Sequence, residues 1–332
     1  MKKEKLLIVG AGLSGLYSAV LLQKCYDVTL TEARDRTGVR IMAMGGHDMG
    51  PSWVWAHQKN ILQLIERLNL ELFPQYTKGF SVYDAPQGVQ RFNPSAVASS
   101  YRIKGGMTQL IAALENRLDM PVSLNEKVIS LTKLEEKIVV KTAAKSYEVD
   151  KVIITVPPRL ALESIEYIPA LPLELQSQLQ NIPTWMGYAA KCVIEYHEAF
   201  WREEGLSGFG VSHLGPLGEI HDACTDEKAA LFGFVHSSAK FENFEEAVIA
   251  QLIRLYGNRA AQPSKIYWVD WKNEQYTSTF LDTMPLKEHP SYGFEATHMD
   301  GKVVFAGTES AFREGGYLEG AIVSALQTVK SL

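Results

Sequence analysis

The chain has 332 residues, of which 46% are hydrophobic and 21% are charged, so its composition is that of an ordinary globular protein. This length is ample for two domains. The net charge of -5 comes from 38 acidic and 33 basic residues, which are spread along the chain and create no basic field that would attract a phosphate backbone. We therefore expect no nucleic acid partner.

The cysteines and the chain ends bear on the cellular compartment. Cys25, Cys192 and Cys224 stand apart, and none belongs to a C-x-x-C pair, which argues against a disulfide framework or a thiolate metal site and favours a reducing compartment. The apolar run at residues 6–9 is much shorter than the core of a signal peptide. The C-terminal segment is amphipathic and lacks an apolar span of about 20 residues. We expect a cytoplasmic protein with no membrane partner.

The first elements in chain order predict a strand, a tight turn, a helix and a second strand. Residues 5–9 form a short apolar run typical of a buried strand. Apolar side chains then recur at helical spacing from Leu13 to Leu21, and residues 28–31 predict the next strand, with Glu32 at its end. Together these elements form a βαβ unit.

The turn of this unit carries G-x-G-x-x-G at Gly10, Gly12 and Gly15. Glycine at these positions permits the tight turn, the approach of the backbone to a pyrophosphate, and close packing of the helix on the strand. Glu32 is placed for a ribose hydroxyl and argues against a 2'-phosphate. The fingerprint therefore predicts a dinucleotide other than NADP, and it does not separate NAD from FAD.

The rest of the chain mixes helices and strands without an internal repeat. Helices are expected over 60–70, from Gly105 to about Leu118, over 244–255 and over 317–329. Residues 73–101 predict loops or short strands. Further strands are expected over 128–131, 138–142, 152–156, 190–196, 230–235, 266–271 and 303–306, and Pro157 and Pro158 should end the third of these.

The segment after the second strand carries a longer motif, E-A-R-D-R-T-G-V-R over residues 32–40, followed by D-M-G-P-S-W over residues 48–53. At this point the sequence resembles the flavin-containing amine oxidase family, whose members carry E-A-R-D-R-x-G-G-R and then D-x-G-x-x-W. The resemblance continues through R-I-K-G-G-M at 102–107, N-E-K-V at 125–128, D-K-V-I-I-T-V-P-P at 150–158, G-T-E at 307–309 and G-Y-L-E-G-A at 316–321.

The resemblance implies an α/β fold. A Rossmann-like FAD-binding domain would be interleaved with a smaller α+β substrate domain, which has a mixed sheet with helices. We expect the FAD-binding domain at residues 1–57, 104–160 and 296–332, and the substrate-binding domain at residues 58–103 and 161–295.

The same motifs imply which residues hold FAD. Arg34 and Arg40 would bring guanidinium groups to the pyrophosphate and the isoalloxazine. Glu309 would accept hydrogen bonds from ribityl hydroxyls, and the last helix would direct its N-terminus, near Tyr317, at the pyrimidine end of the flavin. The implied cofactor-binding residues are Gly10, Gly12, Leu13, Ser14, Gly15, Glu32, Ala33, Arg34, Gly38, Arg40, Gly50, Pro51, Ser52, Trp53, Val128, Trp271, Gly307, Glu309, Gly316, Tyr317, Leu318 and Ala321.

The catalytic residues that the resemblance implies are Lys191 and Tyr317. Lys191 aligns with the family's lysine that reaches flavin N5 through a water, and Tyr317 resembles one wall of the aromatic pair that sandwiches the substrate amine. Trp271 looks like the tryptophan beside the flavin. Phe280 occupies the position of the cysteine that joins the flavin in monoamine oxidases, and Leu281 stands where their second tyrosine would be. Because phenylalanine cannot form a thioether, we expect noncovalent FAD and a substrate pocket lined by Trp271, Phe280, Leu281 and Tyr317.

The implied activity is oxidation of an amine by hydride transfer to flavin N5, with O2 as the electron acceptor and H2O2 as a product. Two alternatives are a flavin desaturase or dehydrogenase that uses another acceptor, and a flavin-binding protein without catalysis. The substrate is left open among monoamines, polyamines and amino acids, because Arg91, Arg102, Glu195 and Glu274 could serve a carboxylate or a cation. No oligomeric state follows from the sequence.

Two features depart from the family pattern. Val39 replaces the second glycine of G-G-R, where the backbone approaches the cofactor. Residues 73–101 are short where relatives insert most of a helical substrate domain, which predicts a shallow, open active site. His47 and His57 flank Asp48 without the i, i+4 spacing of a helical ligand pair, so no metal is expected.

Overall fold

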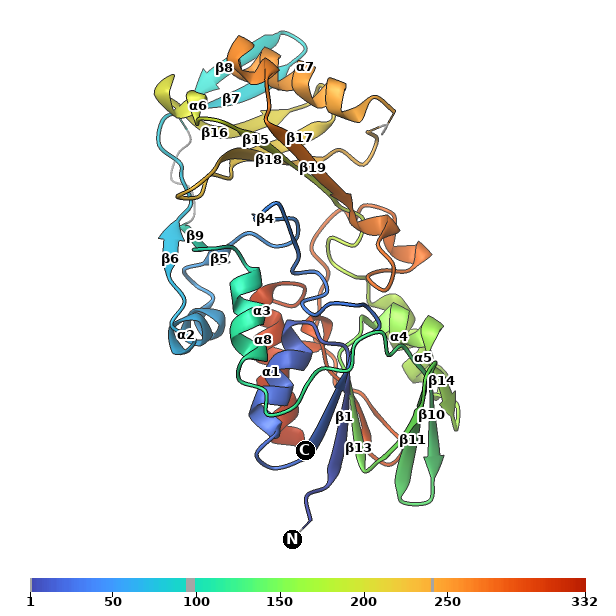
Figure 1. The fold of residues 1–332 in the computed structure, drawn as a ribbon. Helices are drawn as coiled ribbons and strands as arrows, with labels where there is room; N and C mark the ends of the chain where they lie inside the picture. Colours follow the sequence, from blue (N-terminus) through green and yellow to red (C-terminus); the bar gives the residue numbers. More distant parts are fainter. Residues whose placement is uncertain (1, 94–98, 240–241) are drawn as a thin grey trace.

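The computed structural model describes residues 2–93, 99–239 and 242–332. Two lobes lie one above the other in Figure 1: a lower lobe that contains both termini, and an upper lobe built on a large sheet. The lower lobe is an α/β arrangement of the Rossmann type and the upper lobe is a mixed sheet with helices, so the predicted fold class is confirmed.

The lower lobe is organised by a five-stranded sheet with the strand order β2-β1-β13-β21-β20. Its strands are β1 (Lys5–Val9), β2 (Asp27–Thr31), β13 (Lys151–Ile154), β20 (Thr297–His298) and β21 (Val303–Phe305). The strands β2, β1, β13 and β21 run parallel to one another, and β20 is antiparallel to β21. The carboxyl ends of the parallel strands therefore meet at one edge, which is where open α/β sheets bind ligands.

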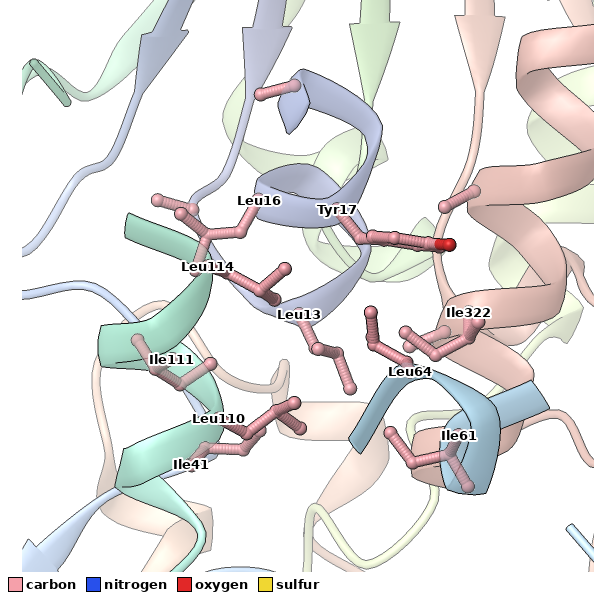
Figure 2. Packing of buried hydrophobic residues seen from close by; sticks show 14 of the residues in the cluster. Leu13, Leu16, Tyr17, Ile41, Ile61, Leu64, Leu110, Ile111, Leu114 and Ile322 are labelled. Atoms are coloured by element: carbon pink, nitrogen blue, oxygen red, sulfur yellow. The ribbon is translucent and has the colours of Figure 1, made fainter. Parts of the chain in front are cut away.

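Helices cover one face of this sheet. They are α1 (Leu13–Leu22), α2 (Lys59–Arg67), α3 (Thr108–Glu115) and α8 (Leu318–Ser331). Leu6 and Ile8 of β1 point into the core that these helices form, whereas Leu7 and Val9 point to the opposite face. Figure 2 shows the helical core, where Leu16 of α1, Leu110 of α3 and Ile322 of α8 converge.

The opposite face packs against a four-stranded sheet with the order β12-β11-β10-β14. This layer contains β10 (Val128–Leu134), β11 (Lys137–Thr142), β12 (Ser146–Val149), α4 (Pro158–Ser164), β14 (Glu166–Ile168) and α5 (Leu173–Asn181). Pro158 begins α4 rather than only ending a strand, because the first position of a helix needs no N–H donor. The sequence pattern did not predict helix α4.

The upper lobe is a seven-stranded sheet with the order β19-β15-β18-β17-β16-β7-β8. Its strands are β7 (Phe80–Ala85), β8 (Gly88–Phe92), β15 (Ala190–Tyr196), β16 (Leu206–Ser212), β17 (Leu217–Asp222), β18 (Ala229–Val235) and β19 (Lys265–Asp270). Helices α6 (Phe200–Glu203) and α7 (Phe244–Tyr256) belong to the same lobe. Cys192 and Ile194 pack on α7, so Lys191 and Val193 point to the other face, toward the lower lobe.

Smaller elements complete the chain. They are β3 (Ala43–Met44), β4 (His47–Asp48), β5 (Val54–Trp55), β6 (Leu72–Pro74), β9 (Ser100–Ile103) and the 3-10 helices η1 (Asn258–Ala261), η2 (Trp271–Asn273), η3 (Phe280–Asp282) and η4 (Thr308–Ser310). The short stretch predicted at 73–101 thus forms strands, two of which, β7 and β8, extend the large sheet at its edge. Residues 94–98 of that stretch lie outside the described part of the chain.

The core packing refines the domain boundaries expected from sequence. Helix α2 packs with α1 and α8, and side chains of α4 and α5 from Ala161 to Leu179 pack with β10 and β11. These segments therefore belong to the core of the lower lobe, although residues 58–103 and 161–295 were assigned to the substrate domain. Amphipathic periodicity reveals a buried face without revealing which sheet covers it. The two-domain division itself stays a prediction.

The described residues contain neither a membrane-spanning helix nor a metal-binding cluster of side chains. Of the helices in that part of the chain, none is long and apolar enough to cross a membrane. No group of three or more His, Cys, Asp or Glu side chains within the same residues could hold a metal ion.

Candidate active site

A cavity of about 620 Å³ lies between the lobes. Its lower wall is formed by the turn after β1, the end of β2 and the N-terminus of α8, and its upper wall by side chains of β15, β17 and β18. The predicted site residues that line it are Gly10, Gly12, Leu13, Ser14, Glu32, Ala33, Arg34, Gly38, Arg40, Gly50, Pro51, Ser52, Trp53, Val128, Lys191, Trp271, Gly316, Tyr317, Leu318 and Ala321.

The glycine fingerprint has the geometry that a close backbone approach requires. Gly10 has φ +100°, a conformation that favours glycine. A Cβ on Gly15 would lie 1.9 Å from the carbonyl oxygen of Gly10, so Gly15 allows α1 to pack on β1 and does not itself line the cavity. Gly12 is the N-cap of α1 and faces the cavity. The first turn of α1 has no acidic residue and no side-chain cap, which leaves its N–H groups available to an anion.

Ser14 and Glu32 provide polar groups beside this helix N-terminus. The hydroxyl of Ser14 is buried and has no hydrogen-bond partner among the described residues. The Glu32 carboxylate is fixed at the end of β2, because its Oε2 accepts from the Ala11 N–H at 2.9 Å and its Oε1 from the Arg34 N–H at 3.0 Å. An unpartnered buried hydroxyl and a fixed carboxylate at this edge fit a ribose and a pyrophosphate.

Arg34 reaches the segment after η2 instead of standing free. Its guanidinium donates to the carbonyl of Gln275 at 2.5 Å, to Oγ1 of Thr277 at 2.8 Å and to Glu274 at 3.3 Å. The side chain still lines the cavity. In this arrangement, Arg34 also joins the end of β2 to the segment after η2, a role that the sequence did not predict.

Arg40 and Glu309 form an ion pair beside the cavity. Nη1 of Arg40 lies 3.1 Å from Oε1 of Glu309, which is 1% exposed. Arg40 lines the cavity, whereas Glu309 and Gly307 lie behind it. Oε2 of Glu309 is buried and has no partner among the described residues. The pair thus offers an acceptor close to the cavity wall.

The N-terminus of α8 also points at the cavity. Tyr317 is its N-cap residue, and Gly316, Leu318 and Ala321 line the wall around it. The hydroxyl of Thr308 donates to the Tyr317 carbonyl at 2.7 Å, which fixes this turn. A helix N-terminus carries a partial positive charge that stabilises negative charge on a neighbouring group.

The Tyr317 ring has aromatic neighbours that the sequence reading did not identify. It stacks on His289 with centroids 4.9 Å apart and an interplanar angle of 2°, and it meets Trp55 edge to face at 5.8 Å. Trp55 lies 6.2 Å from Trp53, and both tryptophans line the cavity. The aromatic surface next to Tyr317 is therefore supplied by Trp55 and His289, where Leu281 was expected.

Lys191 enters the cavity from β15. Its Nζ donates to the Gly50 carbonyl at 3.0 Å and to the Ser52 hydroxyl at 2.5 Å, and lies 4.2 Å from the centroid of the Phe232 ring. The residue is 2% exposed. Burial lowers the pKa of Lys191 to about 7, and the field of Asp48 only partly opposes this shift. The amine and ammonium forms are therefore both populated near neutral pH.

Trp271 lies on the cavity wall, whereas the predicted pocket residues of η3 do not. Trp271 is buried, lines the cavity and donates from Nε1 to the Met49 carbonyl at 3.0 Å. Phe280 is 86% exposed and Leu281 47% exposed, and neither lines the cavity. Their assignment to the substrate pocket is therefore corrected. The buried face of η3 is occupied by Asp282, which accepts from Thr279, Thr184 and Arg159, so Phe280 and Leu281 point outward.

The charged residues that the sequence offered for substrate recognition also lie outside the cavity lining. Arg102 is buried and donates to the Cys224 carbonyl, Glu195 pairs with His47 and Lys228, Glu274 pairs with Arg34, and Arg91 is exposed on β8. The sequence reading missed several lining residues, namely Trp55, Trp185, Met186, Glu219 and Phe234. Only Trp55 had a local signal, since it alternates with Trp53 on one short segment.

Comparisons with known proteins identify the family to which the chain belongs. The family model described as flavin containing amine oxidoreductase matches residues 94–332. The chain belongs to this family. A second model, an NAD(P)-binding Rossmann-like domain, matches residues 8–68, which contain the glycine fingerprint. Family membership implies a flavin cofactor, and the cavity's helix N-termini, unpartnered Ser14 hydroxyl and Arg40–Glu309 pair fit one.

Two of the curated relatives are named as flavin-containing oxidases. The chain is 29% identical over 247 residues to a probable flavin-containing monoamine oxidase A of Dictyostelium discoideum, covering 71% of this chain and 54% of that protein. It is 25% identical to the flavin-containing amine oxidase B of Mus musculus, covering 99% of this chain and 86% of that protein. An L-amino acid dehydrogenase of Synechocystis is 27% identical, with 69% and 50% covered. Apart from the mouse protein, the chain spans about half the length of these relatives.

A solved structure of putrescine oxidase shares the fold. It superposes with a TM-score of 0.85 at 21% identity, covering 99% of this chain and 98% of that chain. A cyclohexylamine oxidase from Brevibacterium oxydans superposes with a TM-score of 0.81 at 18% identity, again covering 99% and 98%.

Proposed function

We propose that the chain binds FAD without a covalent bond and oxidises an amine at the carbon next to nitrogen. The observation that carries this proposal is the buried amine of Lys191, which opens on the same cavity as the glycine fingerprint and the N-terminus of α8. When bound, FAD supplies the hydride acceptor and passes two electrons to O2, which becomes H2O2. The imine product takes up water and yields a carbonyl compound and ammonia or a shorter amine.

Noncovalent binding is supported by the residues around the cavity. Cys192 and Cys224 are buried elsewhere, and in the described part of the chain no cysteine lines the cavity wall. A thioether to the flavin ring therefore has no donor there. Phe280, which replaces the family's attachment residue in sequence, offers none either.

Lys191 is proposed to hold a water at the reacting end of the cavity. An ammonium group has three N–H donors, and two of those on Lys191 are engaged by Gly50 and Ser52. The third is free to hold a water between Nζ and the flavin. Because burial lowers the pKa of Lys191 to about 7, this donor can also give up a proton near neutral pH.

The aromatic side chains are proposed to position the amine and exclude bulk water. Tyr317, Trp55 and Trp53 form a continuous ring surface along the cavity. Burial among these rings removes water and so disfavours the charged form of the reacting amine, against an attraction of about 0.5–2 kcal/mol between a cation and the ring faces. A neutral nitrogen has the lone pair that hydride loss from its carbon requires, so no strong side-chain base is needed.

A second candidate differs only in the electron acceptor. The L-amino acid dehydrogenase relative favours a dehydrogenase that passes electrons to a quinone or a partner instead of O2. Peroxide measurement in air separates the two candidates, since the oxidase releases about one H2O2 for each amine consumed and the dehydrogenase releases none.

The decisive experiment is anaerobic bleaching of the bound flavin by a panel of monoamines, diamines and amino acids. At least one amine should abolish the flavin absorbance, and readmitted air should restore it with release of H2O2. A yellow protein that no amine bleaches would contradict the proposal and leave a flavin-binding protein without catalysis.

Lys191→Met tests the residue that carries the proposal. The variant should keep its FAD and lose about tenfold or more of its oxygen-dependent turnover, because the water next to the flavin loses its donor. Lys265→Met, an exposed lysine on the neighbouring β19, is the matched control and should behave as wild type. Equal turnover of Lys191→Met and wild type in air would make Lys191 a structural residue.

A further inference from the structure

Three cavity-lining side chains stand in one row across the large sheet. Lys191 on β15 is directly opposite Phe234 on β18, and Phe234 is directly opposite Glu219 on β17. Directly opposed residues of antiparallel strands project from the same face of a sheet. All three line the cavity. Because neighbouring strands lie roughly 4.8 Å apart, the backbones at Lys191 and Glu219 are separated by about 10 Å.

The two ends of this row have opposite charge preferences. The Lys191 end disfavours an ammonium, because the site is buried and the Lys191 side chain is itself a cation when protonated. Glu219 brings a carboxylate to the other end, and the first cause of its lowered pKa is the hydrogen bond to His221, which favours its charged form. A β-bulge between Leu217 and Glu219 adjusts the register of β17 at this point. Bulges of this kind commonly redirect a side chain beside an active site.

The surroundings of Glu219 hold its carboxylate in place. Nε2 of His221 lies 2.6 Å from Oε1 of Glu219, and the His221 ring is itself fixed by stacking on Phe232 at 5.1 Å and by an edge contact with Trp53 at 4.7 Å. His221 is the one hydrogen-bond partner that the described residues give this carboxylate, so Oε2 remains available to a ligand.

The other carboxylates on the cavity wall are already engaged. Glu32 accepts two backbone N–H groups at the end of β2, and Glu126 contacts Thr142 and Lys145. Both lie near the predicted dinucleotide region. Within the described part of the wall, Glu219 is therefore the acidic group on the face that carries Lys191.

We propose that Glu219, held by His221, binds a second cationic group on the substrate, so that the preferred substrate is an unbranched aliphatic diamine. This inference rests on the proposed amine oxidation and names its substrate class. The reacting nitrogen lies neutral near Lys191, the carbon chain crosses Phe234, and the far ammonium pairs with Glu219. A monoamine brings no second cation to Glu219, and an amino acid places its carboxylate against it.

The test uses three compounds of equal chain length with the FAD-loaded wild-type protein: 1,6-diaminohexane, hexylamine and 6-aminohexanoate. Wild type should show kcat/KM values that fall in this order, with about three- to tenfold between the diamine and the monoamine, as expected for an ion pair with a carboxylate that is partly screened by solvent. This comparison needs no variant. Equal kcat/KM values for the three compounds would overturn the proposal.

Glu219→Gln should remove the discrimination. We expect its kcat/KM for 1,6-diaminohexane to fall by about three- to tenfold while the value for hexylamine changes less than about twofold. Glu227→Gln, an exposed carboxylate in the turn between β17 and β18, is the matched control and should retain the wild-type order. A Glu219→Gln protein that keeps the full diamine preference would refute the role of Glu219.

Failure of the proposed function is separable from failure of this inference. Reduction of the flavin by any of the amines tests the function, whereas the order among compounds tests the site. If no compound reduces the flavin, anaerobic calorimetric titration decides. A tighter Kd for 1,6-diaminohexane than for hexylamine that disappears in Glu219→Gln would support the site without the oxidase, and equal Kd values would overturn it.

Discussion

Arg40 donates from Nη1 to Oε1 of Glu309 across 3.1 Å, joining two segments that are 269 residues apart in the chain. Oε2 of the same carboxylate is buried and lacks a partner among the described residues. A buried carboxylate oxygen without a hydrogen bond is costly, and such costs concentrate where a ligand completes the network. We therefore propose that this oxygen accepts one more hydrogen bond when FAD is bound, such as one from a ribityl hydroxyl.

Glu309→Gln should weaken FAD binding. The amide keeps the shape of the side chain, but it loses the charge that orients Arg40 and one acceptor oxygen, so the Kd for FAD should rise by about tenfold. Titration of the apoprotein with FAD, followed by quenching of flavin fluorescence, measures this change. Glu136→Gln, which removes an exposed partner of Lys302, is the control. An unchanged Kd would show that Glu309 supports the fold alone.

Val39 stands in a backbone conformation that suits glycine. Its φ is +52°, and its side chain would contact a Cβ on Gly12 at 3.5 Å. The left-handed region costs a side-chain-bearing residue about 1–2 kcal/mol, and a β-branched residue is especially disfavoured there. Glycine also lowers the stability through its extra freedom in the unfolded chain, by about 0.5–1 kcal/mol.

Val39→Gly should therefore raise the free energy of unfolding by up to about 1 kcal/mol. Urea denaturation of the two proteins under identical conditions measures the difference. Val39→Ala keeps a Cβ and therefore most of the backbone strain, so its free energy of unfolding should rise much less. A destabilised glycine variant would mean that contacts of the valine side chain outweigh its backbone strain.

Much of the fold was predictable because its signals are local. The βαβ unit, the strands at 190–196 and 229–235 and the helix at 244–256 were found close to their observed bounds, since each has a clear period and a buried face. Strands β16 and β17 were missed. Gly208 and Gly210 interrupt the apolar pattern of β16, and β17 alternates through Glu219 and His221, which read as loop residues.

The residues of the candidate site were likewise predictable only where the sequence signal is local. Residues carried by motifs, such as Gly12, Lys191 and Tyr317, meet at one cavity, because a motif preserves the backbone path around the ligand. Phe280 and Leu281 were assigned by position alone. Position gave no information on the direction of their side chains, which the cap formed by Asp282 decides. Glu219 reaches the cavity through strand register, a long-range property that no local window contains.

Glu319 provides a test of how α2 is attached to the lower lobe. Its carboxylate accepts from the Asn60 N–H at 3.1 Å and the Ile61 N–H at 2.8 Å, which are free donors in the first turn of α2. The residue is 5% exposed. A buried anion at a helix N-terminus is favoured by the helix dipole as well as by these bonds.

Glu319→Gln should lower the free energy of unfolding by about 1–3 kcal/mol, because one acceptor becomes a donor facing N–H groups. Guanidinium denaturation measures the loss. Glu66→Gln changes an exposed carboxylate on α2 itself and should be nearly neutral. If both variants unfold at the same midpoint, the contact from α8 contributes nothing to the stability of α2.

Lys191 makes stability depend on pH in a defined direction. Burial lowers its pKa from 10.5 to about 7, so between these values the unfolded chain binds a proton that the folded protein does not. The free energy of unfolding should then rise with pH across this window, by at most about 1.4 kcal/mol per unit. Below pH 7 the lysine is charged in both states, and the full cost of burying the charge remains.

Lys191→Met removes this titration, so the stability of wild type relative to the variant should increase steadily from pH 7 to pH 9.5. At pH 6 the free energy of unfolding of the variant is most favourable relative to that of wild type, because the variant no longer buries a charge. This gain is offset in part because the Gly50 carbonyl loses its donor. Urea unfolding at four pH values, with Lys265→Met as the exposed control, gives the comparison. If the difference in unfolding free energy between wild type and Lys191→Met is the same at all four pH values, Lys191 has the same pKa in the folded and unfolded chains. The buried amine would then lack the lowered pKa on which its proposed proton donation depends.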